Sequence, residues 1–207
     1  MKMHILILVI VIAALALSAA PASAVVIDFE SLLQDDASFH NQGSTYNEDG
    51  FTLLADPPSG GLGFVSLGTS YPTFSGSTSL ANFGVGGLTE LALTGGGSFS
   101  LDSIDLAGFN GPNVVPVTFT GDLTGGGTVT TMFTTSGGIG AETFTFSGFE
   151  SVVRVSWLQD APFHQFDNIV ASANNGHAVP EPASLGLLGL GLAGLAWARR
   201  GVRQRLG

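Results

Sequence analysis

The residues that could perform acid–base or metal chemistry lie in the central part of the chain, between two hydrophobic ends. A pair of carboxylates can hydrolyse a glycosidic bond when one has a raised pKa and the two face each other across a cleft, and the sequence indicates neither condition. The histidines lack the spacing of a metal-binding motif, and no G-x-S-x-G motif of a serine hydrolase is present. The residues concerned are Asp35, Asp36, Glu48, Asp49, Asp102, Asp105, His40, His164 and His177. We therefore predict no catalytic site and no enzyme activity.

Two tyrosines in polar segments, Tyr46 and Tyr71, are candidates for stacking on sugar rings. A tyrosine offers a broad apolar face together with a hydroxyl that can form hydrogen bonds. Trp157 is a weaker candidate, because its position in an alternating segment predicts that it points into the core. Local packing of both tyrosines against their own loops remains open as the alternative.

Charge and cysteine content narrow the class of protein further. Of 16 acidic residues only Glu181 lies outside residues 25–178, and of six basic residues only Arg154 lies inside, so this part carries a net charge of about −14. Such a surface repels nucleic acid, which excludes a nucleic-acid partner. The chain has no cysteine, which excludes disulfides, a thiol nucleophile and cysteine-ligated zinc.

The elements that must position these residues are predicted to be short β-strands. Residues 25–173 are rich in Gly, Ser and Thr, and short alternating segments are separated by glycine clusters. This pattern is typical of an all-β antiparallel sandwich, and about 150 residues suit one domain. The predicted strands span residues 25–29, 51–55, 88–93, 98–106, 114–120, 128–134, 142–147, 151–158 and 164–171. Residues 34–50 are predicted to form a loop, and residues 174–178 a linker.

Three details of the alternation give finer predictions. Val153, Val155 and Trp157 share one parity, which places all three in the core. In residues 98–106 the apolar parity changes halfway, which predicts a β-bulge near Asp102 and Ser103. Pro116 cannot donate a ladder hydrogen bond, so we expect its strand to be at an edge or bulged there.

The N-terminus has the layout of a secretory signal peptide. Lys2 supplies the positive charge, residues 5–17 form an apolar stretch, and Ala22-Ser23-Ala24 forms a small-residue cleavage site. We expect cleavage after Ala24, so that residues 1–24 are removed. A retained membrane anchor is the alternative, although the apolar stretch is short for a membrane span.

The C-terminus combines an extended polar segment, an apolar stretch and a basic cluster. The prolines at 180 and 182 are expected to keep the first segment extended. As a helix, residues 183–198 would be about 24 Å long at 1.5 Å per residue, shorter than a hydrocarbon core of roughly 30 Å. The arginines should stay cytoplasmic by the positive-inside rule. The residues are Val179, Pro180, Glu181 and Pro182, followed by Arg199, Arg200, Arg203 and Arg205.

This tail resembles the PEP-CTERM sorting signal of Gram-negative bacteria. The resemblance covers about thirty residues, 179–207, and implies a transient transmembrane helix in the inner membrane, with the body in the periplasm. It further implies that an exosortase cuts at or near residues 179–182 and delivers the body to the cell surface or the extracellular matrix. A plain tail anchor with an unrelated Pro-Glu-Pro is the alternative.

The body resembles the jelly-roll β-sandwich domains found ahead of such tails. The matching pieces include Ile27-Asp28-Phe29-Glu30 in the first strand and Phe166-Asp167-Asn168-Ile169 in the last. In similar folds the first and last strands lie close together and carboxylates from both hold a structural calcium ion. The resemblance therefore implies a candidate Ca²⁺ site at Asp28, Glu30, Asp167 and Asn168, which fits the oxygen ligands that calcium prefers. Capping of strands and loops by these side chains is the alternative.

The resulting hypothesis is an exported surface or extracellular-matrix protein, associated with extracellular polysaccharide or biofilm. A carbohydrate-binding module that uses loop tyrosines is the alternative, and a glycoside hydrolase is the weaker one. No cofactor is predicted other than the candidate structural Ca²⁺. The expected partners are the exosortase, the inner membrane before processing, and extracellular polysaccharide.

Overall fold

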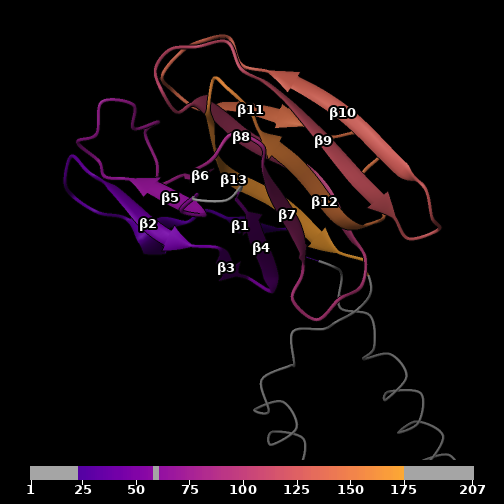
Figure 1. Cartoon of the computed structure of the whole chain (residues 1–207). Coiled ribbons are helices and arrows are strands. Elements are labelled where there is room, and N and C mark those ends of the chain that lie inside the picture. The colour runs from indigo at the N-terminus through magenta and orange to yellow at the C-terminus, as the bar shows by residue number, and fades with distance from the viewer. Residues whose placement is uncertain (1–22, 58–60, 175–207) are drawn as a thin grey trace, which may run out of the picture. The chain divides into compact units, whose positions relative to one another are not determined.

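The computed structural model describes residues 23–57 and 61–174, which form an all-β antiparallel sandwich with a jelly-roll-like arrangement of strands (Figure 1). Within these residues every strand pair is antiparallel, and the one helical element is the single 3-10 turn η1 (Glu30–Leu32). The predicted fold class is confirmed. The predicted signal peptide, linker and C-terminal helix lie outside the described residues, apart from Ser23 and Ala24 at the cleavage site and Asn174 at the start of the linker.

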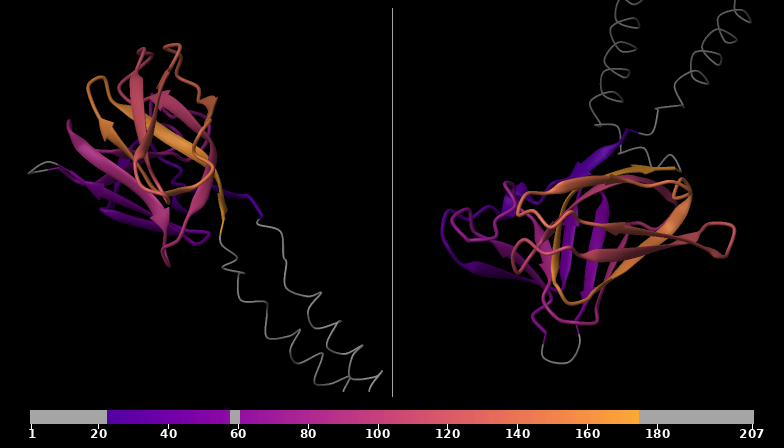
Figure 2. Two further views of the ribbon diagram at one scale, coloured as in Figure 1. Left: turned by 90° about the vertical axis from the view of Figure 1, so that its right-hand side faces the viewer. Right: turned by 90° about the horizontal axis from the view of Figure 1, so that it is seen from above.

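The strands form two layers, which Figure 2 shows from the side and from above. One layer has the order β10-β9-β12-β7-β4-β3, and the other has the order β2-β5-β6-β13-β8-β11, with β1 also paired to β13. The layers connect where Val152 pairs with Phe99. The strands are β1 (Val25–Ile27), β2 (Phe39–Gly43), β3 (Thr45–Glu48), β4 (Phe51–Asp56), β5 (Phe64–Leu67), β6 (Leu80–Asn82), β7 (Gly87–Leu93), β8 (Phe99–Gly108), β9 (Pro116–Leu123), β10 (Thr128–Thr134), β11 (Glu142–Thr145), β12 (Val152–Gln159) and β13 (His164–Ala173).

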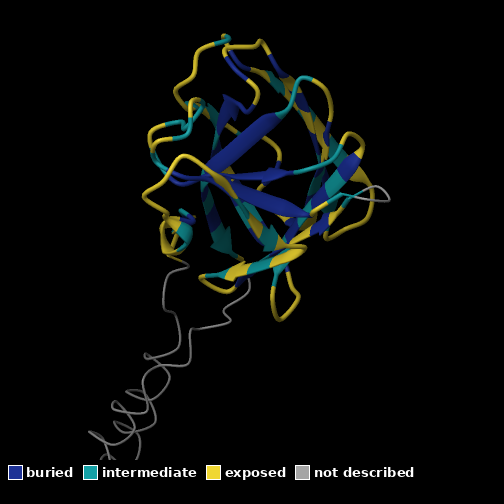
Figure 3. Ribbon diagram, turned by 60° about the vertical axis from the view of Figure 1, so that its left-hand side comes forward, coloured by how far each residue is buried: buried dark blue, intermediate teal, exposed yellow. Residues whose placement is uncertain are grey.

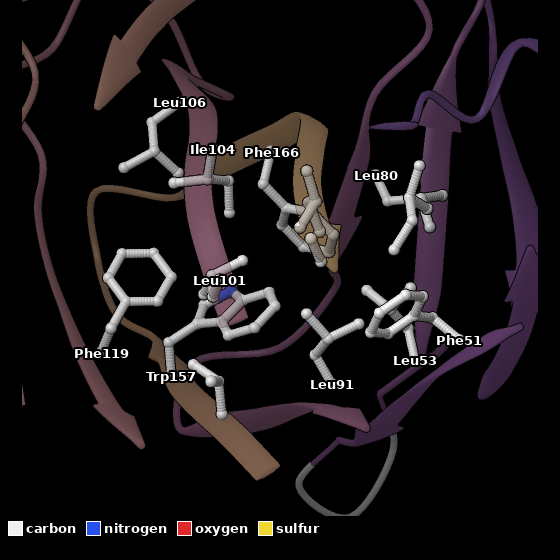
Figure 4. Close-up of a cluster of buried hydrophobic side chains, with 14 of the residues drawn as sticks. Phe51, Leu53, Leu80, Leu91, Leu101, Ile104, Leu106, Phe119, Trp157 and Phe166 are labelled. Atoms are coloured by element: carbon white, nitrogen blue, oxygen red, sulfur yellow. The ribbon is translucent and has the colours of Figure 1, made fainter. Parts of the chain in front are cut away.

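The core lies between the two layers, as the distribution of buried residues shows (Figure 3). Alternate residues of each strand point inward, which is the period-2 pattern that the sequence predicts. Trp157 of one layer meets Phe166 of the other edge-to-face at 5.1 Å between ring centroids, and Phe51 meets Phe99 in the same way at 5.3 Å. Figure 4 shows Trp157, Phe166 and Phe51 in the interior, together with aliphatic neighbours such as Leu53 and Leu91.

The predicted bulge near Asp102 and Ser103 is confirmed. On β13, Val170 and Ala171 are consecutive, but their partners on β8 are Ser103 and Leu101, so Asp102 is the extra residue. The bulge restores the inward direction of the apolar side chains on both sides of it. Leu101 and Ile104 are both buried as a result, although their separation is odd.

The prediction that Val153 belongs to the core is wrong. Val152 is fully buried, whereas Val153 is 38% exposed. The register between β12 and β9 shifts between Val152 and Arg154, so the inward parity of Val155 and Trp157 does not extend back to Val153. Pro116 lies on β9 between β10 and β12, but pairing with β12 begins only at Phe119, so the strand is locally unpaired on that side, as expected.

The prediction that residues 34–50 form a loop is also wrong, because they contain β2 and β3. Both strands lie at the margin of a layer, and no residue in either is fully buried, so their sequences lack the apolar alternation of a core strand. Strands β5 and β6 were not predicted. All residues in them are buried, because a second hydrophobic cluster covers the outer face of β5 and β6.

Candidate functional site

The whole predicted sorting signal, and all of the predicted signal peptide except Ser23 and Ala24, lie outside the described part of the chain. This applies to Ala22, to the motif Val179, Pro180, Glu181 and Pro182, and to the basic residues Arg199, Arg200, Arg203 and Arg205. Ala24 is described and is exposed just before β1, where a peptidase could reach it. Within residues 23–57 and 61–174, no helix has the length and apolar character needed to cross a membrane.

The structure joins the two ends of the body, as the candidate calcium site requires. Strand β1 pairs with β13, with Ile27 opposite Ile169. Glu30 follows β1 and accepts hydrogen bonds from Thr78, through its N–H at 3.0 Å and its hydroxyl at 3.3 Å. The hydroxyl of the adjacent Ser77 donates to Asp167 Oδ2. Glu30 and Asp167 are therefore held by neighbouring residues of the loop between β5 and β6.

Asp167 is a buried carboxyl group among acidic neighbours. It is 1% exposed, and burial is the main reason why its pKa rises from 3.8 to about 7. The nearby charges of Asp105 and Glu30 raise the pKa further, whereas hydrogen bonds from Ser77 and the Asn168 N–H oppose the rise. At neutral pH a large share of Asp167 therefore carries a proton.

Asn168 presents donors to these carboxylates rather than a ligand oxygen. Its N–H donates to Asp167 Oδ1 at 2.7 Å, and its side-chain Nδ2 donates to Asp105 Oδ2 at 3.0 Å and Asp167 Oδ2 at 3.2 Å. Asn168 has a positive φ of 45°, which turns the strand at this point. These hydrogen bonds already use Asp167, so a bound cation would have to displace the Asn168 amide. Among the described residues no group of three or more His, Cys, Asp or Glu is arranged to hold a metal ion.

Asp28 forms no hydrogen bond with Asp167 or Asn168 among the described residues. It accepts a hydrogen bond from the Glu30 N–H at 3.0 Å, and its charge contributes to raising the pKa of Tyr46. The four candidate residues thus do not form one ligand shell. Asp167 and Asn168 lie together with Asp105, Glu30 is held next to them by Thr78, and Asp28 is held by the Glu30 N–H. The calcium site stays a prediction.

The two candidate sugar-binding tyrosines lie in different hydrophobic clusters. Tyr46 is half-buried on β3, where its ring packs on Phe29 at 5.2 Å and its hydroxyl donates to Glu48 Oε2 at 3.2 Å. Burial raises the pKa of Tyr46. Tyr71 lies in the loop between β5 and β6 and packs against the second cluster. The half-buried side chains of Phe74, Phe83 and Phe163 pack against the same cluster.

Of the three candidate histidines, two lie in the described part of the chain. His164 lies on β13 and is 1% exposed, and its burial lowers the pKa of the ring to about 3, so it is neutral. Its Nε2 has no hydrogen-bond partner among the described residues. His40 Nε2 lies 3.0 Å from Asp36 Oδ1, and the hydrogen bond between them lowers the pKa of the Asp36 carboxyl group. His177 lies outside the described residues.

Sequence reasoning missed the residues that surround Asp167. Asp105 was not included in the candidate calcium site, yet Asp105 pairs with Asp167 across β8 and β13. Ser77 and Thr78 reach the site from a loop 90 residues away in sequence. No local pattern in the sequence marks these two residues.

Comparison with protein families identifies the PEP-CTERM protein-sorting motif at residues 178–200, which confirms the predicted sorting signal. A search of curated protein sequences found no match to this chain.

The body is a β-sandwich, and the solved structures that it resembles include carbohydrate-binding modules. A carbohydrate-binding module of family 29 is 15% identical with a TM-score of 0.42, over 74% of this chain and 90% of that one. The family 11 module of the cellulosomal cellulase Lic26A-Cel5E of Clostridium thermocellum is 9% identical with a TM-score of 0.31, over 77% and 99%. A family 11 module from the same organism, in complex with a β-1,3-1,4-mixed-linked tetrasaccharide, is 10% identical with a TM-score of 0.31, over 74% and 97%.

Proposed function

We propose that this chain is an exported substrate of an exosortase, which cuts it at or near residues 179–182 and releases the β-sandwich to the cell surface or extracellular matrix. The observation that carries the proposal is the PEP-CTERM motif at residues 178–200. The small-residue site ending at Ala24 supports export. Before the cut, the C-terminal apolar stretch holds the chain in the inner membrane with its arginines in the cytoplasm.

Processing in the native bacterium tests this route. Glu181→Ala, or deletion of residues 199–207, should leave a longer precursor in the membrane fraction on an immunoblot. Glu150→Ala serves as the control, because it removes one exposed acidic side chain from the body and leaves the tail intact. Normal processing of both tail variants would contradict the proposal.

For the body we propose a structural role in a matrix that contains extracellular polysaccharide. Its net charge of about −14 keeps it soluble and disfavours anionic polymers, so the polysaccharide should be neutral, or anionic only with bridging cations. Arg154, the single base of the body, is engaged by Glu90 and Asp122 at 2.8 and 2.7 Å. No uncommitted arginine or lysine is therefore left on the described surface to attract an anionic chain.

Carbohydrate binding is the second candidate, and the half-buried aromatic cluster around Tyr71 favours it. A glycan array probed with the full-length chain and with Tyr71→Ala tests it, because Tyr71 lies at the rim of this cluster. Binding to a defined glycan that is lost in Tyr71→Ala would support a binding module. Tyr46→Ala is the comparison, since Tyr46 packs on the core residue Phe29. Equal binding by all three proteins would contradict a role of the two tyrosines in glycan binding. Absence of binding by the full-length chain would favour the structural role.

A further inference from the structure

One strand of the sandwich presents an open and unprotected edge. Five described strands have a single pairing partner: β1, β2, β3, β10 and β11. Natural proteins protect such edges by making them short, charged or bulged. Strand β1 has three residues, β3 and β11 have four each and carry Glu48 and Glu142, and β2 has a register shift. Strand β10 has none of these features.

Strand β10 has the properties of a pairing edge. Its seven residues, TVTTMFT, contain no charge, no proline and no glycine, and β-branched and aromatic residues dominate them. Its register with β9 runs without a shift from Thr128 opposite Asp122 to Thr134 opposite Pro116. Met132 is 62% exposed. Figure 1 shows β10 at the margin of its layer, with no described strand on its free side.

The hydrogen-bond pattern identifies which backbone groups are available. The Thr135 N–H donates to Val115 O at 3.1 Å, and the Leu123 N–H donates to Gly127 O at 3.0 Å. Hydrogen-bonded and non-hydrogen-bonded pairs alternate along an antiparallel ladder. The odd-numbered residues of β10 therefore direct their backbone groups to β9. The N–H and C=O groups that point to the free side belong to Thr128, Thr130, Met132 and Thr134.

We propose that two copies of this chain associate through β10, in an antiparallel pair with a two-fold axis at Thr131. In this register the hydrogen-bonded pairs are Thr128 with Thr134 and Thr130 with Met132, all of which have free backbone groups. The non-hydrogen-bonded pairs join Val129 with Phe133, an aromatic–β-branched pair of the kind that stabilises sheets, and Thr131 with its own copy. A two-fold interface of this type is self-complementary.

The charge of the body sets the conditions for this association. Each copy carries a net charge of about −14, so two copies repel at long range. The edge itself is uncharged, so the paired residues do not repel at contact. Salt screens the long-range repulsion, with a Debye length of about 8 Å at 0.15 M. Association should therefore strengthen as salt is added. This association involves the body alone and does not depend on processing of the tail.

Cysteine cross-linking of the full-length chain in mild detergent tests the register directly. The chain has no cysteine, so a single introduced thiol reports one contact. In the proposed dimer Thr131 faces its copy in a non-hydrogen-bonded pair with a Cα separation of about 4.5 Å, within the range for a disulfide. Thr131→Cys should form a disulfide-linked dimer under mild oxidation.

Thr128→Cys is the matched control. Thr128 is exposed, whereas Thr131 is half-buried, so simple accessibility favours the control. In the proposed register the two copies of residue 128 are six residues apart along the strands, about 20 Å at 3.4 Å per residue. We expect Thr131→Cys to cross-link at least about tenfold faster. Association through the hydrophobic ends would raise both rates equally.

Thr130→Pro, added to Thr131→Cys, completes the test. It removes a donor from the free edge but leaves the ladder to β9 intact, and circular dichroism checks that the sheet persists. The cross-linking rate should fall to that of Thr128→Cys. Equal rates for the two single variants would overturn the proposal, as would a Thr131→Cys rate that Thr130→Pro leaves unchanged in a folded chain.

Discussion

Asp167→Asn should stabilise the protein at neutral and alkaline pH. The raised pKa means that the folded state holds a proton on Asp167 that the unfolded state releases. The protonated Asp167 therefore contributes its full stabilisation of the folded state below about pH 3.8, and this stabilisation is lost as the pH rises through about 7. Asn resembles the protonated acid and does not titrate. Its amide oxygen can keep the hydrogen bond from the Asn168 N–H, and its NH₂ group can donate to Ser77 Oγ, which now donates to the carboxyl group.

The size of the effect follows from the shift. A rise from 3.8 to about 7 corresponds to roughly 4 kcal/mol at 1.36 kcal/mol per pKa unit. Ser77 and Asn168 are half-buried, so solvent partly screens the charge of Asp167. We therefore expect Asp167→Asn to stabilise the protein by about 2–4 kcal/mol at alkaline pH. The free energy of unfolding of Asp167→Asn, minus that of the wild type, should be near zero at about pH 4 and reach this value at about pH 8.

Urea unfolding at several pH values measures this difference. The comparison at each pH also cancels the effect of His164, whose lowered pKa of about 3 acts in the opposite direction. His164 contributes stability above about pH 6.5 that is lost as the pH falls toward about 3. Asp102→Asn is the control, because it removes the same charge from an exposed position of β8, and so reports only the change in self-repulsion.

Two outcomes would refute this reasoning. A stability difference for Asp167→Asn that does not change with pH, or that matches Asp102→Asn throughout, would show that burial does not protonate Asp167. If instead Asp167→Asn were destabilised above neutral pH and Ca²⁺ raised the melting temperature of the wild type alone, the group would act as a charged ligand, and the calcium hypothesis would be supported in its place.

Three further predictions concern packing and charge, and urea unfolding checks each. Phe166→Ala should lower the free energy of unfolding by about 3–5 kcal/mol, because the ring is 1% exposed at the centre of the core. Gly121→Ala should cost about 1–3 kcal/mol, since its Cβ would lie 2.8 Å from Val152 Cγ1 and 2.9 Å from Phe149 Cε1. Arg154→Gln should cost no more than about 1 kcal/mol, because the ion pairs are solvent-exposed, and the loss should shrink in high salt. A cost at Arg154 above that at Phe166 would contradict this ranking.

The alternation of side chains predicted much of the core but not its irregularities. Leu101 and Ile104 could be placed together only by assuming a bulge, which the pairing with β13 bears out. The register shift in β12 could not be predicted, because Val152 and Val153 are both apolar and either could be the first residue of the strand that points into the core. A register shift between two identical residues leaves no trace in composition.

The candidate sites depended on contacts that are distant in sequence. The pairing of β1 with β13 was expected, so the proximity of Glu30 to Asp167 could be predicted from the sequence. The approach of Ser77 was not, because it requires the β5–β6 loop to fold over the outer face of the sheet. The open edge of β10 could not be foreseen either, since hydrophobic periodicity predicts a strand but not its neighbours.

The central claim is that a β-sandwich is exported and then cut free of its sorting tail, and the mass of the protein recovered from the cell surface tests it most directly. Mass spectrometry should find an N-terminus at Val25 and a C-terminus within or next to residues 179–182. Recovery of the intact 207-residue polypeptide, with both hydrophobic ends present, would contradict the account.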